Sequence, residues 1–553
     1  MRKFLARLPL RSFTQKSEPV FSRLSAHLFP RLFSIDGRSL AAFRIGVGAL
    51  VLVDLWTRST AIEQHYTDAG VLPREAYTRL LSVSDWQWSI HFLTGDVAGQ
   101  STLFLLAAAA AFALIAGYRT RAASILSWAL LVSLQTRNPM LLYGADQLLR
   151  LLLFWSMFLP LGSMWSLDRR RTDSNTDGMR DLSIASAALL LQPCVMYLFS
   201  GLLKWNTSWE SGNALGYALS ADMYVTPLGQ MLASFPTIVA MLGALVPWIE
   251  ILAPVGLFMP WSTAAFRTIT LAFLVVFHAA IAATLHTGLF PLVVFVSLVP
   301  FVPALVWDRL GIGRTDVAPL RTGNVAEPPR RISRMARQSS LVLQASVAAL
   351  VLYGLAWNVV GINVHDYAAR NALTWMKEWW SEGRSGVPLS FRDYAVERRM
   401  GPFGWIGRVT GLHQRWDMFE RAGPEMRGWP LVVGTLTDGQ KVNVLGADVA
   451  GKAGARIPPE APLAFYPGTR WLVYFTYLRT SGTKAARELL PAVVTRDWER
   501  RYPGKQIDSM QILFVQPSVA TSRAATGMTS SAGDRLVPVR TADVWYDGPA
   551  NGH

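Results

Sequence analysis

One lysine lies where an apolar stretch meets a loop that contains two tryptophans. Lys204 ends the run Tyr197-Leu-Phe-Ser-Gly-Leu-Leu-Lys204, and Trp205 and Trp209 follow it. Burial beside apolar groups disfavours the ammonium form, so such a lysine can act as a general base near neutral pH. The alternative is a lysine that extends its amine into the lipid headgroups. The residues alone leave both interpretations open.

Two histidines lie in and just after a later apolar stretch. His278 follows Phe277, and His286 comes about two helical turns further on. A single histidine in a helix is usually a hydrogen-bonded packing residue. The two histidines and Glu250 would suit a metal ion, but nothing in their spacing enforces this, and we expect no metal.

The other ionisable residues of the apolar stretches also need partners, because an unpaired charge in a membrane is costly. Glu250 would be neutralised by Arg44 or Arg150 in a structural ion pair, or would take part in proton transfer. Asp54 and Asp146 have the same two interpretations.

The composition indicates lipid as the solvent for most of the chain. Of 553 residues, 51% are hydrophobic and 16% are charged, and the net charge is +16. The basic residues border the apolar stretches and form no single patch with interleaved aromatics, so we expect membrane lipids as partners and no nucleic acid. The one cysteine, Cys194, lies in an apolar run, which excludes an intramolecular disulfide and favours a packing role.

Nine apolar stretches are long enough, or nearly so, to cross a bilayer as helices, which takes about 20 residues each. They are residues 39–56, 101–118, 122–135, 148–165, 183–203, 236–259, 266–285, 288–307 and 340–360. The third is short. We therefore predict a mainly α polytopic membrane protein with about nine transmembrane helices.

The distribution of Lys and Arg predicts the orientation of these helices. Basic residues recur in alternate loops, at 119–121, 169–180, 267 and 309–337. Those loops should be cytoplasmic, together with a basic amphipathic segment at residues 1–38 that lies along the membrane surface. The first loop, with Arg58, Arg74 and Arg79, is an exception. The transmembrane domain at residues 39–361 then leaves residues 362–553 outside the cytoplasm.

The composition after residue 361 is that of a β-rich α+β domain. Residues 431–444 predict a hairpin, because apolar and β-branched runs flank Thr437-Asp438-Gly439. Residues 512–515 and 537–544 are further strand candidates, and residues 471–490 predict a helix. The Ser-, Thr-, Ala- and Gly-rich residues 520–534 are expected to form a flexible loop.

Several short motifs, in order along the chain, resemble the family of horizontally transferred transmembrane domain (HTTM) proteins, whose best-known type is vitamin K-dependent γ-glutamyl carboxylase. In the membrane part they are Phe43-Arg44-Ile-Gly, Tyr66-Thr-Asp-Ala-Gly-Val-Leu-Pro-Arg74, Gly117-Tyr-Arg119, Arg137-Asn-Pro139 leading to Tyr143-Gly144, Tyr197 to Lys204, and Phe277-His278. Later ones are Arg415-Trp-Asp-Met-Phe419 and Arg470-Trp471. The resemblance covers roughly residues 35–515.

The resemblance implies a reaction and roles for individual residues. In the carboxylase, a lysine at the position of Lys204 deprotonates reduced vitamin K, which then reacts with O₂ to give a strong base. That base removes a proton from a protein glutamate, which takes up CO₂. Lys204 and His278 would be catalytic here, and Tyr197, Trp205 and His286 would bind the reduced vitamin K-type quinone.

One region departs from the family pattern. The carboxylase has a histidine important for carboxylation just before its Tyr-x-Tyr-Gly motif, whereas Arg137-Asn138-Pro139-Met140 lies there in this sequence. We therefore expect a carboxylase-like membrane enzyme that uses a lipid quinone and O₂ for carboxylation or a related oxidation of an exported peptide or a lipid.

The alternative is a non-catalytic scaffold or maturation factor for exported proteins. A transporter would need a polar pathway across the membrane, and most of the candidate charges lie near one face. The abundance of Ala and Arg indicates a bacterial inner membrane. By the orientation predicted above, the N-terminus would be cytoplasmic and the C-terminal domain periplasmic.

Overall fold

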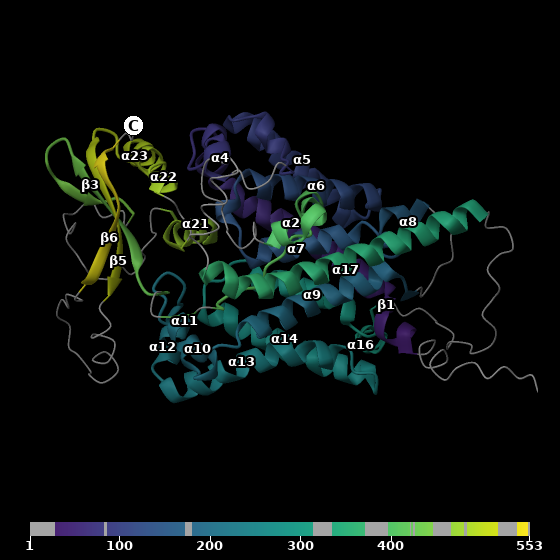
Figure 1. Cartoon of the computed structure of the whole chain (residues 1–553). Helices are drawn as coiled ribbons and strands as arrows, with labels where there is room; N and C mark the ends of the chain where they lie inside the picture. Colours follow the sequence, from purple (N-terminus) through teal and green to yellow (C-terminus); the bar gives the residue numbers. More distant parts are fainter. Residues whose placement is uncertain are drawn as a thin grey trace, which may run out of the picture.

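The computed structural model describes residues 28–81, 86–171, 180–312, 334–370, 396–420, 422–423, 426–445, 466–480, 484–517 and 539–550. Most of these residues form a bundle of long helices, and a small antiparallel sheet lies at one end of it (Figure 1). Most of the predicted basic segment at residues 1–38, and the whole predicted loop at 520–534, lie outside the described residues.

Six helices are long and apolar enough to cross a membrane. They are α2 (Gly37–Ser59), α5 (Val97–Ala116), α9 (Ile184–Leu203), α13 (Pro236–Leu257), α14 (Thr263–Thr284) and the segment Leu341–Ile362 of α17 (Arg334–Arg370). They coincide with six of the nine predicted stretches. The other three stretches contain α6 (Thr120–Arg137), α7 (Gly144–Ser156) and α15 (Phe290–Leu298), which are shorter or less apolar.

Helix α7 differs most from its prediction, which placed a helix at residues 148–165. The helix begins earlier, where the carboxylate of Asp146 accepts a hydrogen bond from the backbone N–H of Tyr143 at 3.0 Å. It ends at Ser156, and a turn that contains Pro160 follows. The guanidinium of Arg44 on α2 donates to three backbone carbonyls of this turn, at residues 161, 164 and 165. These contacts satisfy carbonyls that a continued helix would have bonded internally.

The start and end of α9 follow from its capping residues. The side chain of Ser183 accepts a hydrogen bond from the N–H of Ser186 and so begins the helix. Lys204 is the C-terminal cap, and Asn206 caps the next short helix by accepting from the N–H of Ser208. The chain therefore turns directly after Lys204.

Short helices and a two-residue strand pair connect the long helices. The helices are α3 (Ile62–Tyr66), α4 (Arg74–Leu81), α8 (Leu167–Arg171), α10 (Thr207–Glu210), α11 (Asn213–Ala218), α12 (Pro227–Ala233) and α16 (Ala304–Arg309). The strands β1 (Ile35–Asp36) and β2 (Arg180–Asp181) pair antiparallel. Helices α8 and α16 lie at the end of the bundle opposite to the larger sheet (Figure 1).

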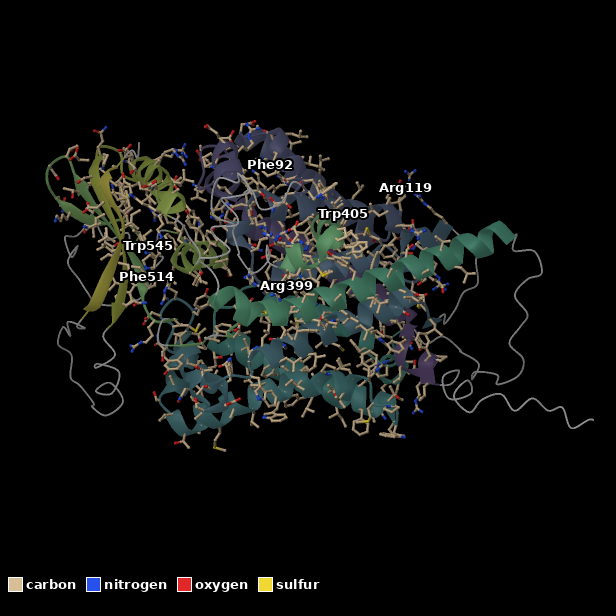
Figure 2. All side chains as sticks on the ribbon, viewed as in Figure 1. Phe92, Arg119, Arg399, Trp405, Phe514 and Trp545 are labelled. Atoms are coloured by element: carbon tan, nitrogen blue, oxygen red, sulfur yellow. The ribbon has the colours of Figure 1, made fainter. Side chains whose placement is uncertain are left out.

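The C-terminal sheet has the strand order β4-β3-β5-β6, and all its pairs are antiparallel. Its strands are β3 (Trp429–Leu436), β4 (Lys441–Asn443), β5 (Ile507–Pro517) and β6 (Val539–Pro549). The predicted hairpin is confirmed, with Gly439 at φ 83° in its turn. The rings of Phe514 and Trp545 stack on this sheet with centroids 5.4 Å apart (Figure 2).

Three helices accompany the sheet, where the sequence predicted one helix at residues 471–490. They are α21 (Thr469–Thr480), α22 (Lys484–Arg487) and α23 (Leu490–Arg501). The predicted helix is therefore confirmed in its first part, and residues 481–483 lie outside the described residues.

One segment assigned from sequence to the C-terminal domain returns to the helix bundle. It contains α20 (Gly404–Thr410) and the residues that follow it. Arg150 on α7 donates to the carbonyl of Gly411 at 2.8 Å, and Gln192 on α9 donates to the side chain of Gln414 at 2.9 Å. Part of the chain beyond residue 361 thus completes the packing of the membrane-type helices.

A buried network of four charged side chains, the Arg470 network, attaches α21 to the bundle. It comprises Asp54 and Arg58 on α2, Asp146 on α7 and Arg470 on α21. Arg58 bonds Asp54 at 2.8 Å and also Asp146, while Arg470 bonds Asp146 at 2.6 Å and also Asp54. Two positive and two negative charges cancel, which is the arrangement that buried charges require.

Candidate functional site

A cavity of about 1120 Å³ lies between the helix bundle and the C-terminal segments. Helices α9, α13 and α14 form its inner wall, and residues 415–420 together with α21 line the side toward the C-terminal region. The α13 and α14 walls are mostly apolar, with Leu245, Ile249, Phe277 and Ile281 among the lining side chains. A few polar groups interrupt this lining, as in many small-molecule sites.

Lys204 lies on this wall with its amine turned inward. The residue is 3% exposed, and its Nζ donates to Glu250 Oε1 at 3.0 Å and Oε2 at 2.8 Å. A further hydrogen bond reaches Ser200 Oγ at 2.6 Å, and the ring of Trp209 lies 5.6 Å from the amine. The alternative that Lys204 extends into the headgroups is therefore wrong, because its amine is held inside the protein.

Glu250 takes a different partner from those considered in the sequence. Arg44 bonds backbone carbonyls after α7, and Arg150 bonds Gln135 and the carbonyl of Gly411. Neither therefore neutralises Glu250. Its ion pair is with Lys204, which is closer in sequence and lies on the adjoining helix α9.

A glycine on α9 sets the close approach of the two helices at this point. A Cβ atom at Gly201 would lie 2.7 Å from Ile251 Cγ1 and 3.0 Å from the carbonyl oxygen of Pro247, both on α13. Side chains do not tolerate contacts this short, so glycine permits the helix distance at which the lysine amine reaches Glu250.

Tyr197 and His278 form a second polar pair on the same wall. The Tyr197 hydroxyl lies 2.8 Å from His278 Nε2, and the bond joins α9 to α14. His278 Nδ1 is buried and has no hydrogen-bond partner among the described residues. Both side chains line the cavity. The structure thus brings together three of the predicted site residues: Lys204, Tyr197 and His278.

The family comparison covers the wall residues on α9, α13 and α14. Residues 33–305 match the family model of the HTTM domain. The chain contains an HTTM domain. The predicted resemblance to the HTTM family is thereby confirmed over these residues. No match was found among curated proteins or among solved structures.

We refer to the cavity lined by α9, α13, α14, residues 415–420 and α21 as the HTTM cavity. Of the two other predicted quinone-binding residues, His286 lines this cavity and Trp205 does not. His286 lines the outer part of the cavity, and its side chain is exposed. Trp205 does not line the cavity: it is 54% exposed and packs edge to face on Trp248 with ring centroids 5.1 Å apart. Trp209 lines the cavity instead, because the chain turns after Lys204 and α10 brings this ring back.

The region that departs from the carboxylase pattern has a structural place in the HTTM domain. Arg137 donates to the carbonyl of Leu72 at 2.8 Å, and Asn138 donates to the carbonyl of His65 at 2.8 Å. These residues are buried, and they do not line the cavity. They hold α3 and the loop after it against the end of α6 and the start of η2 (Pro139–Leu141).

Sequence reasoning missed two contributors to the site, Ser200 and Gly201, and the partner of a third, Glu250. Ser200 and Gly201 lie inside the quoted Tyr197–Lys204 motif, and their spacing of four and three residues before Lys204 places them on the same side of α9. Glu250 was considered, but its partner was not. Among the described residues, no three His, Cys, Asp or Glu side chains are grouped to hold a metal ion.

Proposed function

We propose that this protein is a membrane enzyme that uses a reduced lipid quinone and O₂, with Lys204 and its partner Glu250 in the HTTM cavity as the basic pair that receives the first proton. The buried amine of Lys204 on the wall of a largely apolar cavity carries this proposal. The reaction is a carboxylation or a related oxidation of a peptide or a lipid, as the resemblance to vitamin K-dependent carboxylase implies.

The residues of the cavity suit a reduced quinone. A reduced quinone is an apolar ring system with two hydroxyl groups and, in lipid forms, an apolar tail. The apolar side chains of α13 and α14 would hold the ring and tail, while Lys204, Tyr197 and His278 would face the hydroxyl groups. The unpartnered Nδ1 of buried His278 supports this assignment, because a buried polar atom without a partner is costly.

When bound, the quinone supplies an acidic hydroxyl and the electrons for O₂. The protein's residues have three tasks. The Lys204–Glu250 pair accepts and holds a proton, the Tyr197–His278 pair orients an oxygen atom, and the apolar walls exclude water. Exclusion of water strengthens each of these electrostatic interactions.

The second substrate would enter from the side of the C-terminal region. Residues 415–420 and α21 form part of the cavity wall, and Arg415, Asp417, Thr476 and Arg479 are among their lining side chains. These polar groups suit a peptide backbone better than a lipid tail. We therefore favour an exported peptide or protein over a lipid as the carbon acid.

We also propose nine crossings of a bacterial inner membrane. Helices α7 and α15 each begin next to the cavity, at Tyr143 and Phe290, and lead to α8 and α16 at the opposite end of the bundle. Arg119 lies toward that opposite end in Figure 2, and α8 holds three further arginines. Because cytoplasmic loops carry an excess of Arg and Lys, that end would be cytoplasmic and the sheet periplasmic.

The orientation is tested by labelling intact cells with a membrane-impermeant maleimide. In a Cys194→Ala background, a cysteine at the exposed turn residue Asp438 should react before lysis. A cysteine at the exposed Arg170 on α8 should react only after lysis. The reverse pattern would overturn the orientation.

The activity is tested with purified protein, a reduced naphthoquinone and O₂, and formation of the quinone epoxide is measured. Wild type should form epoxide, and Lys204→Met and His278→Ala should not. Glu210→Gln is a matched control, because Glu210 is exposed on α10 and does not line the cavity. Absence of both epoxide formation and quinone binding in wild type would favour the non-catalytic scaffold instead.

A further inference from the structure

The hydrogen bonds of the Lys204 amine indicate which group can hold a proton taken from a ligand. An ammonium group has three N–H donors and no lone pair, so it cannot accept a proton. The amine of Lys204 has two hydrogen bonds to the carboxylate of Glu250 and a third to Ser200 Oγ. Three short donor contacts fit the charged form of the lysine, with Glu250 as its counter-ion.

The opposite distribution, a neutral amine beside a protonated carboxyl, contains the same number of protons. The hydrogen bonds between the two groups connect these distributions, because a proton can pass along them. In either distribution the pair can gain only one proton. The gained state is an ammonium beside a carboxylic acid, so the additional proton is held on Glu250.

We propose that Glu250 is the proton acceptor of the HTTM cavity and that Lys204 transmits the proton to it. This inference rests on the proposed function and adds to it the residue that holds the proton. Glu250 itself lines the cavity, so the acceptor lies on the same wall as the lysine. In the described part of the chain, its only ion pair is with Lys204.

The step balances without a further reactant. The O–H bond of a bound phenolic ligand breaks, an O–H bond forms on Glu250, and Lys204 exchanges one N–H proton for another. No electrons are transferred. Lys204 remains an ammonium before and after the step, and it balances the negative charge that the proton donor keeps.

The position of Glu250 on α13 makes the transfer short. Gly201 allows α9 and α13 to approach closely, and the Nζ to Oε distances of 2.8 and 3.0 Å are those of direct hydrogen bonds. No rearrangement of either helix is needed for the proton to pass between them.

The test is infrared difference spectroscopy of the full-length protein, recorded without O₂ on addition of reduced 2-methyl-1,4-naphthoquinone. Wild type should gain a carboxylic-acid C=O band that shifts in D₂O. Glu250→Gln should lack the band, Glu250→Asp should show it at a changed frequency, and Glu210→Gln should match wild type. In a parallel assay under O₂, Glu250→Gln should oxidise the quinone at least roughly 100-fold more slowly than wild type, which is the usual loss for a missing acid–base group.

The outcomes separate this inference from the proposed function. An unchanged band or unchanged oxidation rate in Glu250→Gln would overturn the role of Glu250 while leaving the enzyme intact. Binding of the naphthoquinone to wild type without any carboxylic-acid band would do the same. Failure of wild type to bind or oxidise the naphthoquinone would overturn both. The Glu250→Asp variant retains the charge, so its spectrum decides the matter if Glu250→Gln does not fold.

Discussion

The amine of Lys204 on α9 bonds both carboxylate oxygens of Glu250 on α13. These two residues are 46 positions apart in the chain, yet their helices approach closely enough for the pair to be buried. A pair of opposite charges in this position has consequences for both stability and chemistry.

Removing one member of the Lys204–Glu250 pair should destabilise the protein more than removing both. Lys204→Met leaves a buried carboxylate without its counter-ion and should cost about 3–5 kcal/mol of unfolding free energy. The double variant Lys204→Met/Glu250→Leu has no buried charge at this place and should unfold close to wild type. Denaturant unfolding in detergent measures both, and losses that simply add would argue against the pair.

Gly201→Ala should separate α9 from α13. The added methyl group would lie 2.7 Å from Ile251 Cγ1, and overpacking of this kind costs about 1–3 kcal/mol. It should also slow quinone oxidation, because the Lys204–Glu250 distance increases. Gly216→Ala on α11 is the control, since its nearest neighbour would be 3.8 Å away. Equal effects of the two substitutions would contradict the close-approach role of Gly201.

Arg470→Met should weaken the attachment of the C-terminal region. It leaves Asp54 and Asp146 with Arg58 alone, and breaking such a buried network costs about 3–5 kcal/mol. Limited proteolysis should then release C-terminal fragments faster than from wild type. Arg500→Met removes an exposed ion pair with Glu63 and should cost at most about 1 kcal/mol. The same cleavage rate in both variants would contradict the role assigned to the Arg470 network.

Asp497 on α23 should make stability depend on pH. Burial raises the pKa of its carboxyl group above the usual value, against hydrogen bonds from Gln64 and Tyr466 that lower it. The folded state thus holds a proton that the unfolded state releases above about pH 3.9. The resulting penalty grows as the pH rises through the window between the two pKa values and is complete above it.

The variant Asp497→Asn has no such penalty. Its thermal unfolding midpoint should exceed that of wild type at neutral pH, and the difference should diminish as the pH falls toward 4, near the ordinary pKa of the side chain. A difference that does not change with pH would show that the amide acts by hydrogen bonding alone.

Local sequence features correctly predicted the helices and turns that depend on interactions between residues close together in the chain. Apolar runs of about 20 residues with a capping residue, such as the run of α9 after Ser183, became long helices. The turn Thr437-Asp438-Gly439 became the β3–β4 hairpin, because Gly439 adopts the positive φ that the turn needs. Helix α7 was misplaced because its end depends on Arg44 of α2, more than a hundred residues earlier.

The pairing of charges could not be predicted for the same reason. Asp54 and Arg470 are 416 positions apart, and nothing in either neighbourhood specifies the other. Arg44 and Arg150 were reasonable partners for Glu250 by charge, but in the folded chain both donate hydrogen bonds to backbone carbonyls instead. The motif around Lys204 indicated a candidate site, whereas the tertiary structure identified the counter-ion of Lys204.

The most direct test of the central claim is uptake of O₂ on addition of a reduced naphthoquinone to purified protein in lipid nanodiscs. Wild type should consume O₂ in proportion to epoxide formed, and Glu210→Gln should behave alike. The Lys204→Met/Glu250→Leu variant, which should remain folded, should consume none above the rate without protein. O₂ uptake by this double variant at the wild-type rate would contradict a catalytic Lys204 in the HTTM cavity.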